Sequence, residues 1–126
     1  MNGSFDPETI RLLDETNEVR IETSLDEDAP VHRTTIWVVT VEGDVFVRSV
    51  YGERGRWYRE IRANPSAAVH LGDDRIPARA FPVTDDATIE AVSEAYQEKY
   101  GRTSPGSTRA MLQPETLPTT LRLEPA

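Results

Sequence analysis

Hydrophobic residues recur along the chain with two different periods, and the first clear pattern is that of β-strands. Residues 19–24 (V-R-I-E-T-S) alternate apolar and polar side chains, which predicts a half-buried strand. Residues 34–41 and 44–50 are rich in β-branched and aromatic side chains and flank Glu42-Gly43. Two such runs joined by a short glycine-containing link predict a β-hairpin.

Helical spacing appears in three other segments. Asp6 is a good N-cap residue ahead of a short apolar stripe, so we expect a helix over about residues 6–15. Residues 57–62 (W-Y-R-E-I-R) predict a short helix, and 86–100 predict the longest one because apolar side chains recur there every three or four positions. The acidic segment 25–33 and the segment 102–109 are expected to be loops.

The remaining strands complete an antiparallel pattern. Residues 66–71 and 75–83 predict a second hairpin, and 120–124 can supply a closing strand. The predicted order is helix, three strands, helix, two strands, helix, strand. Two hairpins and a returning last strand favour a mainly β fold with helices (α+β), a small six-stranded antiparallel barrel. With 126 residues, we expect a single domain over 1–126 whose core spans about 19–124.

Composition narrows the class of protein. The chain has no apolar run of about 18 residues, so we expect no membrane span. Its N-terminus lacks the basic start and apolar stretch of a signal peptide. It contains no cysteine, which excludes disulfides, thiolate metal sites and cysteine nucleophiles. These features together predict a cytoplasmic protein.

Charge argues against nucleic acid as a partner. The formal net charge is −8, whereas nucleic-acid binding requires a basic surface. Nearly all the positive charge is arginine, since Lys99 is the only lysine. Arginine offers a rigid fork of donors that suits phosphates and carboxylates.

Motifs for side-chain catalysis are not evident. His32 and His70 are the only histidines, and neither has the spacing of a metal-ligand motif. No G-x-S-x-G nucleophile motif occurs, and Asp73-Asp74 is better explained as a hairpin turn than as an acid/base pair. We therefore predict no catalytic side chain and no metal ligand.

The segment 48–62 is the one chemically distinctive stretch, because it concentrates five arginines in an acidic chain. Arg48 alternates with Phe46 and Val50 and so shares a strand face with them. Gly52 and Gly55 allow close approach of backbone N–H groups to a ligand, just before a helix N-terminus that favours anions. These residues alone leave three interpretations open: a phosphate cradle, a solvated turn and a charge patch for a partner.

A family resemblance bears on that choice. The stretch V-F-V-R-S-V-Y-G-E-R-G-R-W-Y-R-E-I-R-A-N-P-S-A-A-V-H-L-G resembles the central block of the flavin-binding split β-barrel superfamily. It is similar to the pyridoxamine-phosphate-oxidase-like proteins and the deazaflavin-dependent nitroreductase group, and R-T-T-I-W-V-V (33–39) resembles the first half of their hairpin. The resemblance covers about residues 19–101 and is greatest to a small bacterial group of unknown function.

The resemblance implies a six-stranded split β-barrel with two or three helices, forming a homodimer with a flavin near the subunit interface. Residues 48–50 would line the cofactor, 54–56 would hold its phosphate, Thr34 and Thr35 would lie near its ring or ribityl chain, and Trp57 would buttress the loop. The implied cofactor-binding residues are Thr34, Thr35, Arg48, Ser49, Val50, Arg54, Gly55, Arg56 and Trp57.

The function implied is that of an oxidoreductase that uses FMN or a deazaflavin to transfer hydride to or from a small organic substrate. The flavin itself would carry the redox chemistry, which is consistent with a chain that lacks catalytic motifs. The G-R-x-S-G stretch of the deazaflavin enzymes is replaced here by D-E-D-A-P-V-H, so the choice of cofactor stays open. Two alternatives remain: a non-enzymatic carrier of an anionic or phosphorylated small molecule, and a family member without cofactor that serves as an interaction protein.

Overall fold

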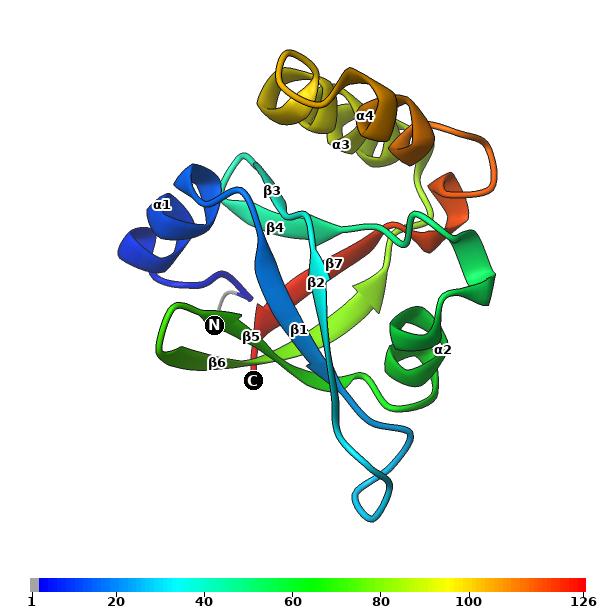
Figure 1. Cartoon of the computed structure of the whole chain (residues 1–126). Coiled ribbons are helices and arrows are strands. Elements are labelled where there is room, and N and C mark those ends of the chain that lie inside the picture. The colour runs from blue at the N-terminus through cyan, green and yellow to red at the C-terminus, as the bar shows by residue number, and fades with distance from the viewer. Residues whose placement is uncertain (1–2) are drawn as a thin grey trace.

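Residues 3–126, the part that the computed structural model describes, place all their strands in one sheet (Figure 1). Every neighbouring pair of strands is antiparallel, in the order β2-β1-β5-β6-β7-β4-β3. The strands are β1 (Val19–Thr23), β2 (His32–Ile36), β3 (Val39–Val41), β4 (Asp44–Val47), β5 (Ser66–Leu71), β6 (Asp74–Pro82) and β7 (Leu121–Pro125). The sheet curls into a half-barrel, as expected from the two predicted hairpins and the returning last strand.

The predicted number of six strands is wrong, because the run 34–41 forms two strands. The chain leaves the sheet at one edge after Ile36, crosses through Trp37 and Val38, and enters the opposite edge at Val39. Only two residues connect the two edge strands, so the sheet must curl far enough to bring its edges together. The predicted turn that follows is confirmed: Glu42 (φ 50°) and Gly43 (φ 85°) connect β3 and β4, both with the positive φ of a tight hairpin turn.

Within residues 3–126, four α-helices accompany the sheet, whereas two or three were expected. Three of them match the predicted segments: α1 (Pro7–Glu15), α2 (Arg56–Ala63) and α3 (Asp86–Tyr100). The carboxylates of Asp6 and Asp85 cap α1 and α3 by accepting the backbone N–H of Thr9 and Thr88.

The fourth helix corrects the expectation of a loop over 102–109. Helix α4 (Pro105–Met111) begins with a proline in its first turn, a position that helices tolerate well. Two of its side chains, Thr108 and Met111, are buried, and α4 packs against α3. Tertiary packing stabilises this short helix, which its glycine- and serine-containing sequence does not predict.

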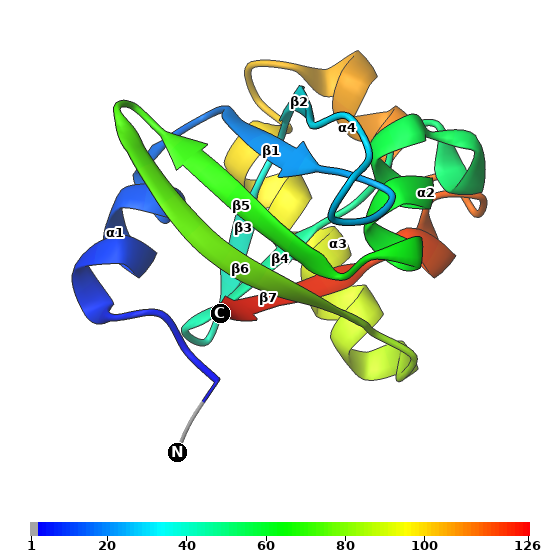
Figure 2. The same ribbon diagram turned by 90° about the horizontal axis from the view of Figure 1, so that it is seen from below.

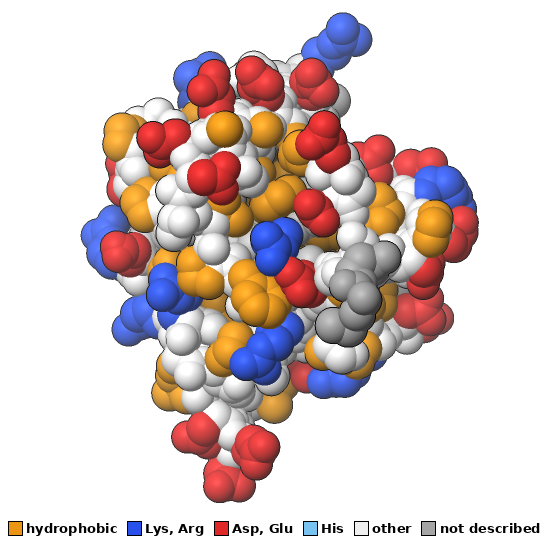
Figure 3. Space-filling view, turned by 180° about the vertical axis from the view of Figure 1, so that it is seen from behind, with side chains coloured by type: hydrophobic (Ala, Val, Ile, Leu, Met, Phe, Trp, Pro, Cys, Tyr) orange, Lys and Arg blue, Asp and Glu red, His pale blue; other side chains and the backbone are white. Residues whose placement is uncertain are grey.

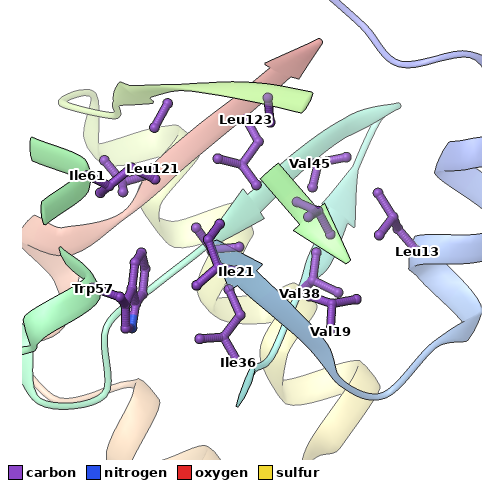
Figure 4. Close-up of a cluster of buried hydrophobic side chains, with 14 of the residues drawn as sticks. Leu13, Val19, Ile21, Ile36, Val38, Val45, Trp57, Ile61, Leu121 and Leu123 are labelled. Carbon is purple, nitrogen blue, oxygen red and sulfur yellow. The ribbon is translucent and has the colours of Figure 1, made fainter. Parts of the chain in front are cut away.

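Two apolar clusters lie on the two faces of the sheet. The larger cluster fills the inside of the curl, where side chains from both halves of the sheet meet those of α1 and α2 (Figure 4). The second lies between the sheet and α3, and it includes Phe46, Val92, Tyr96 and Tyr100. The inner face of the curled sheet therefore encloses the larger apolar core, and its outer face is covered by α3.

The view from below shows how the helices are distributed around the sheet (Figure 2). The long twisted hairpin of β5 and β6 runs across the molecule between α1 and α2, while α3 and α4 lie beyond it. From behind, acidic side chains gather at the lower tip, which is the loop carrying the exposed Asp26, Glu27 and Asp28 (Figure 3). Within residues 3–126, no helix is both long and apolar enough to cross a membrane.

Candidate functional site

A pocket of about 450 Å³ opens where five separate segments meet. Strand β2 and the residue after it form one wall, and the loop after β4 together with the start of α2 forms another. Helix α4 and the residue before β1 complete it. The lining residues are Glu18, Thr34, Thr35, Ile36, Trp37, Arg48, Val50, Tyr51, Gly55, Arg56, Trp57, Ser107 and Met111. The volume lies within the range of small-molecule sites, about 300–1,000 Å³.

Most of the residues that the sequence nominated converge on this one pocket. The exceptions are Ser49 and Arg54, which do not line it. Arg54 belongs to a short 3₁₀ turn, η1 (Gly52–Arg54), and is exposed. The structure thus brings strand and loop candidates together, although contact between any of them and a cofactor stays a prediction. The candidates lining the pocket are Thr34, Thr35, Arg48, Val50, Gly55, Arg56 and Trp57.

The start of α2 presents the features of an anion site at the pocket wall. Gly55 is the N-cap residue and supplies no side-chain cap to the helix. Because the first backbone N–H groups of a helix have no intrahelical partner, they remain available to a ligand, and the helix dipole favours a negative one. Arg56, the first residue of α2, is exposed and adds a guanidinium at the same place.

Ser49 lies directly beneath Gly55. A Cβ placed on Gly55 would lie 2.5 Å from Ser49 Oγ, so only glycine allows this close approach. Ser49 is 1% exposed, and within residues 3–126 its hydroxyl has no hydrogen-bond partner. A buried hydroxyl without a partner is costly, and its position beside the start of α2 makes it a candidate contact for a ligand.

Arg48 has a different environment from the other arginines of the segment. It is fully buried, and its guanidinium donates to Thr120 Oγ1 (2.8 Å), Met111 O (3.2 Å) and Ile89 O (2.7 Å). Its charge also lies 5.6 Å from the centroid of the Tyr96 ring. Burial lowers the pKa of Arg48 from its usual value. The side chain therefore joins β4 to α3, α4 and β7 behind the pocket.

Trp57 belongs to both the core and the pocket. It is 6% exposed and packs with the larger apolar cluster (Figure 4). Its ring meets that of Tyr58 edge-to-face, with centroids 6.2 Å apart and planes at 84°. These contacts fix the first turn of α2 against the sheet, next to Gly55.

Several lining residues were missed by sequence reasoning. Trp37 was counted as part of a continuous strand, although it lies at the bend between β2 and β3. Ser107 and Met111 belong to the unpredicted helix α4. In the sequence, Trp37 is part of an apolar run that is typical of a continuous strand, so no local signal marks it as a pocket residue.

Neither histidine lines the pocket. His32 Nδ1 lies 2.8 Å from Glu60 Oε2, and His70 Nε2 lies 2.7 Å from Glu22 Oε1. Both imidazoles are thus engaged with carboxylates on other parts of the sheet and of α2. In the part of the chain that is described, no group of three or more His, Asp or Glu residues is placed to hold a metal ion.

The curled sheet and its pocket define the split-barrel class, and solved structures of similar fold support this. One is the heme storage protein HutZ from Vibrio cholerae (TM-score 0.67, 16% identity, covering 98% of this chain and 91% of that one). Another is an F420-H2-dependent reductase, FDR-A (TM-score 0.62, 16% identity, 86% and 94%). A third is a putative pyridoxamine 5′-phosphate oxidase from Listeria innocua (TM-score 0.61, 14% identity, 94% and 90%).

The particular family follows from the sequence itself. Residues 9–123 match the family described as "uncharacterized protein conserved in bacteria (DUF2255)", and the chain belongs to that family. No curated protein is similar enough in sequence to count as a match. At 14–16% identity the solved structures establish a shared fold.

Proposed function

We propose that the pocket binds a flavin-type cofactor, FMN or a deazaflavin, and that the protein is an oxidoreductase acting on a small organic substrate. The observation that carries this proposal is the uncapped start of α2 at Gly55 and Arg56, which opens into a pocket lined by aromatic and aliphatic side chains. A phosphate and a planar ring need these two environments side by side.

The residues present fit such a cofactor. Glycine at position 55 lets the start of α2 lie close to Ser49, whose unpartnered hydroxyl a Cβ at that position would meet at 2.5 Å. In our proposal, Arg56 and the first backbone N–H groups of α2 hold the phosphate, and the hydroxyls of Thr34 and Thr35 orient the ribityl chain. Arg54, outside the pocket lining, contributes positive charge only.

When bound, the flavin supplies the hydride chemistry, and the protein's part is to bind, orient and exclude water. Ile36, Val50 and Met111 provide apolar walls for that purpose. The heme-binding neighbour suggests another ligand, but a histidine-ligated heme is disfavoured because His32 and His70 are paired with carboxylates outside the pocket. A non-enzymatic carrier of a phosphorylated molecule would use the same anion site.

Ligand-dependent thermal unfolding tests the proposal. FMN or a deazaflavin 5′-phosphate at a hundredfold excess over Kd should stabilise the protein by about 2.7 kcal/mol, which is roughly 10 °C in Tm for a chain of this size. Arg56→Gln should weaken FMN binding roughly 10- to 100-fold, because it removes a charge-assisted hydrogen bond. It should leave riboflavin, which has no phosphate, unaffected.

Arg79→Gln is the matched control, since Arg79 is exposed on β6 and does not line the pocket. Equal FMN affinity in the Arg56 and Arg79 variants would contradict the phosphate assignment. Absence of any shift with either cofactor would contradict the proposal as a whole. If FMN binds but NADPH does not bleach its absorbance, the carrier function is favoured over the enzyme.

We also propose that the protein acts as a homodimer. Val50 and Tyr51 are 40% and 72% exposed, and both lie at the pocket. Large apolar side chains exposed beside a binding site are typical of a surface that another subunit covers.

A further inference from the structure

The position of Trp37 is explained neither by the proposed anion site at the start of α2 nor by the strand pattern. It lies in the two-residue crossing between β2 and β3, is partly buried, and lines the pocket. Its neighbours in the chain, Ile36 and Val38, point into the larger core cluster. Trp37 instead contacts the cluster beneath α3, so its ring stands between α3 and the pocket.

One face of the Trp37 indole is already covered. The ring of Tyr100 stacks on it with centroids 3.9 Å apart and planes within 4° of parallel. The Tyr96 ring follows at 6.5 Å from Trp37, inclined by 30°. Since Tyr96 and Tyr100 both project from α3, the helix supports the indole from behind.

Tyr100 is itself held in place, which makes the indole a rigid wall. Its hydroxyl donates to Asn17 O (2.6 Å) and accepts the backbone N–H of Val38 (3.3 Å). The ammonium group of Lys99 lies 5.3 Å from the Tyr100 ring centroid. Contacts from three directions therefore fix the tyrosine and, through it, the plane of Trp37.

We propose that Trp37 is the stacking surface on which the planar, fused aromatic ring of the pocket's ligand lies, and that it is a specificity-determining residue. This inference rests on the proposed function, because it names what recognises the ring once the anion site holds the phosphate. A rigid aromatic plane next to the apolar side chains of Ile36 and Met111 favours a planar ring over a flexible or saturated one.

Fragments of the cofactor test binding of the ring and binding of the phosphate separately. Riboflavin carries the ring without the phosphate, inorganic phosphate carries the anion alone, and FMN carries both. Trp37→Ala should weaken riboflavin and FMN roughly 10- to 100-fold, the range found for loss of one stacked base. It should leave the affinity for inorganic phosphate unchanged. Trp37→Phe, which keeps an aromatic plane, should retain most of the ring affinity.

Two further variants distinguish loss of stacking from a general structural effect. Val83→Ala alters the same apolar cluster at a residue outside the pocket, so it should lower Tm without changing riboflavin affinity. In Trp57→Phe, Trp37 is the only remaining tryptophan, and riboflavin should quench its fluorescence on binding.

The outcomes distinguish this inference from the proposal on which it rests. If wild-type protein binds neither FMN nor the deazaflavin, the proposed function fails, and the stacking inference fails with it. If FMN and riboflavin bind wild type and Trp37→Ala equally well, or Trp37 fluorescence does not respond in a Trp57→Phe protein whose Tm riboflavin still raises, only the stacking role is overturned.

Discussion

At the scale of single residues, the arginines of segment 48–62 occupy two kinds of environment, and Arg48 is in the buried one. Its charged group is buried and satisfied by one hydroxyl and two backbone carbonyls, whereas Arg54 and Arg56 are exposed. A buried charge is tolerated only where hydrogen bonds replace its water. Arg48 therefore shapes the rear of the pocket by holding α3 and α4 against the sheet.

Arg48→Ala should lower the free energy of unfolding by roughly 3–5 kcal/mol, because it leaves a cavity and three acceptors without their donor. Urea denaturation of the ligand-free protein measures this loss. Arg54→Ala removes the same charge from an exposed position and should change stability by no more than about 0.5 kcal/mol. Similar stabilities of the two variants would refute a structural role for Arg48.

At the scale of elements, a ladder of charged side chains links four neighbouring strands. Glu22 on β1 accepts from Arg75 on β6 (2.7 Å) and pairs with His70 on β5 (2.7 Å), while Arg33 on β2 lies 3.8 Å away. The hydrogen bond from Arg75 is the main cause that lowers the pKa of Glu22 to about 2, and burial opposes it. Cross-strand pairs of this kind stabilise sheets.

The lowered pKa of Glu22 predicts how stability depends on pH. A carboxyl whose pKa is lower in the folded than in the unfolded protein contributes stability that is complete above its ordinary pKa of 4.5 and is lost as the pH falls toward 2. The stability difference between wild type and Glu22→Gln should therefore be largest near pH 6 and shrink toward pH 2.5. Chemical denaturation across this range measures it.

Asp73→Asn is the control, since Asp73 is exposed in the turn between β5 and β6. This surface change should alter stability by no more than about 0.5 kcal/mol. A gap between wild type and Glu22→Gln that stays constant from pH 6 to 2.5 would exclude the ionised carboxylate as its source.

At the scale of the whole molecule, the pocket exists because the sheet curls. Strands β2 and β3 are edge strands of one sheet, yet only Trp37 and Val38 separate them in sequence. Lys99 Nζ donates to Val38 O (2.7 Å) and to Leu13 O (2.9 Å), which fastens this crossing to α1 and α3. Trp37 therefore lines the pocket because the sheet curls until its two edges meet.

The proposed homodimer can be tested at the same scale. Tyr51→Glu places a charge on an exposed apolar side chain at the pocket and should shift a dimer toward monomers, because an interface excludes an unpaired charge. Light scattering coupled to size exclusion measures the mass of each variant. Glu53→Gln, nearby and exposed, should leave the mass unchanged. A monomeric wild type across micromolar concentrations would contradict the proposal.

The sequence alone determined the elements whose signals are local. The turn residues Glu42-Gly43 and the alternation around them predict a hairpin, and Asp6 predicts the start of a helix, because a few neighbouring residues decide these conformations. The glycines and arginines around the start of α2 marked it as a candidate anion site, which stays a prediction. Alternation also placed Arg48 on the face of Phe46, on which α3 packs.

Only the tertiary structure decided the rest, and the reason is that burial depends on partners distant in sequence. The run 34–41 divides at Trp37 because the sheet closes on itself, and 105–111 become a helix because α3 packs beside them. Arg48 becomes buried because Ile89, Met111 and Thr120 surround it. The same convergence of distant segments brought most of the candidate residues to one pocket, beside the uncapped start of α2 and Trp37.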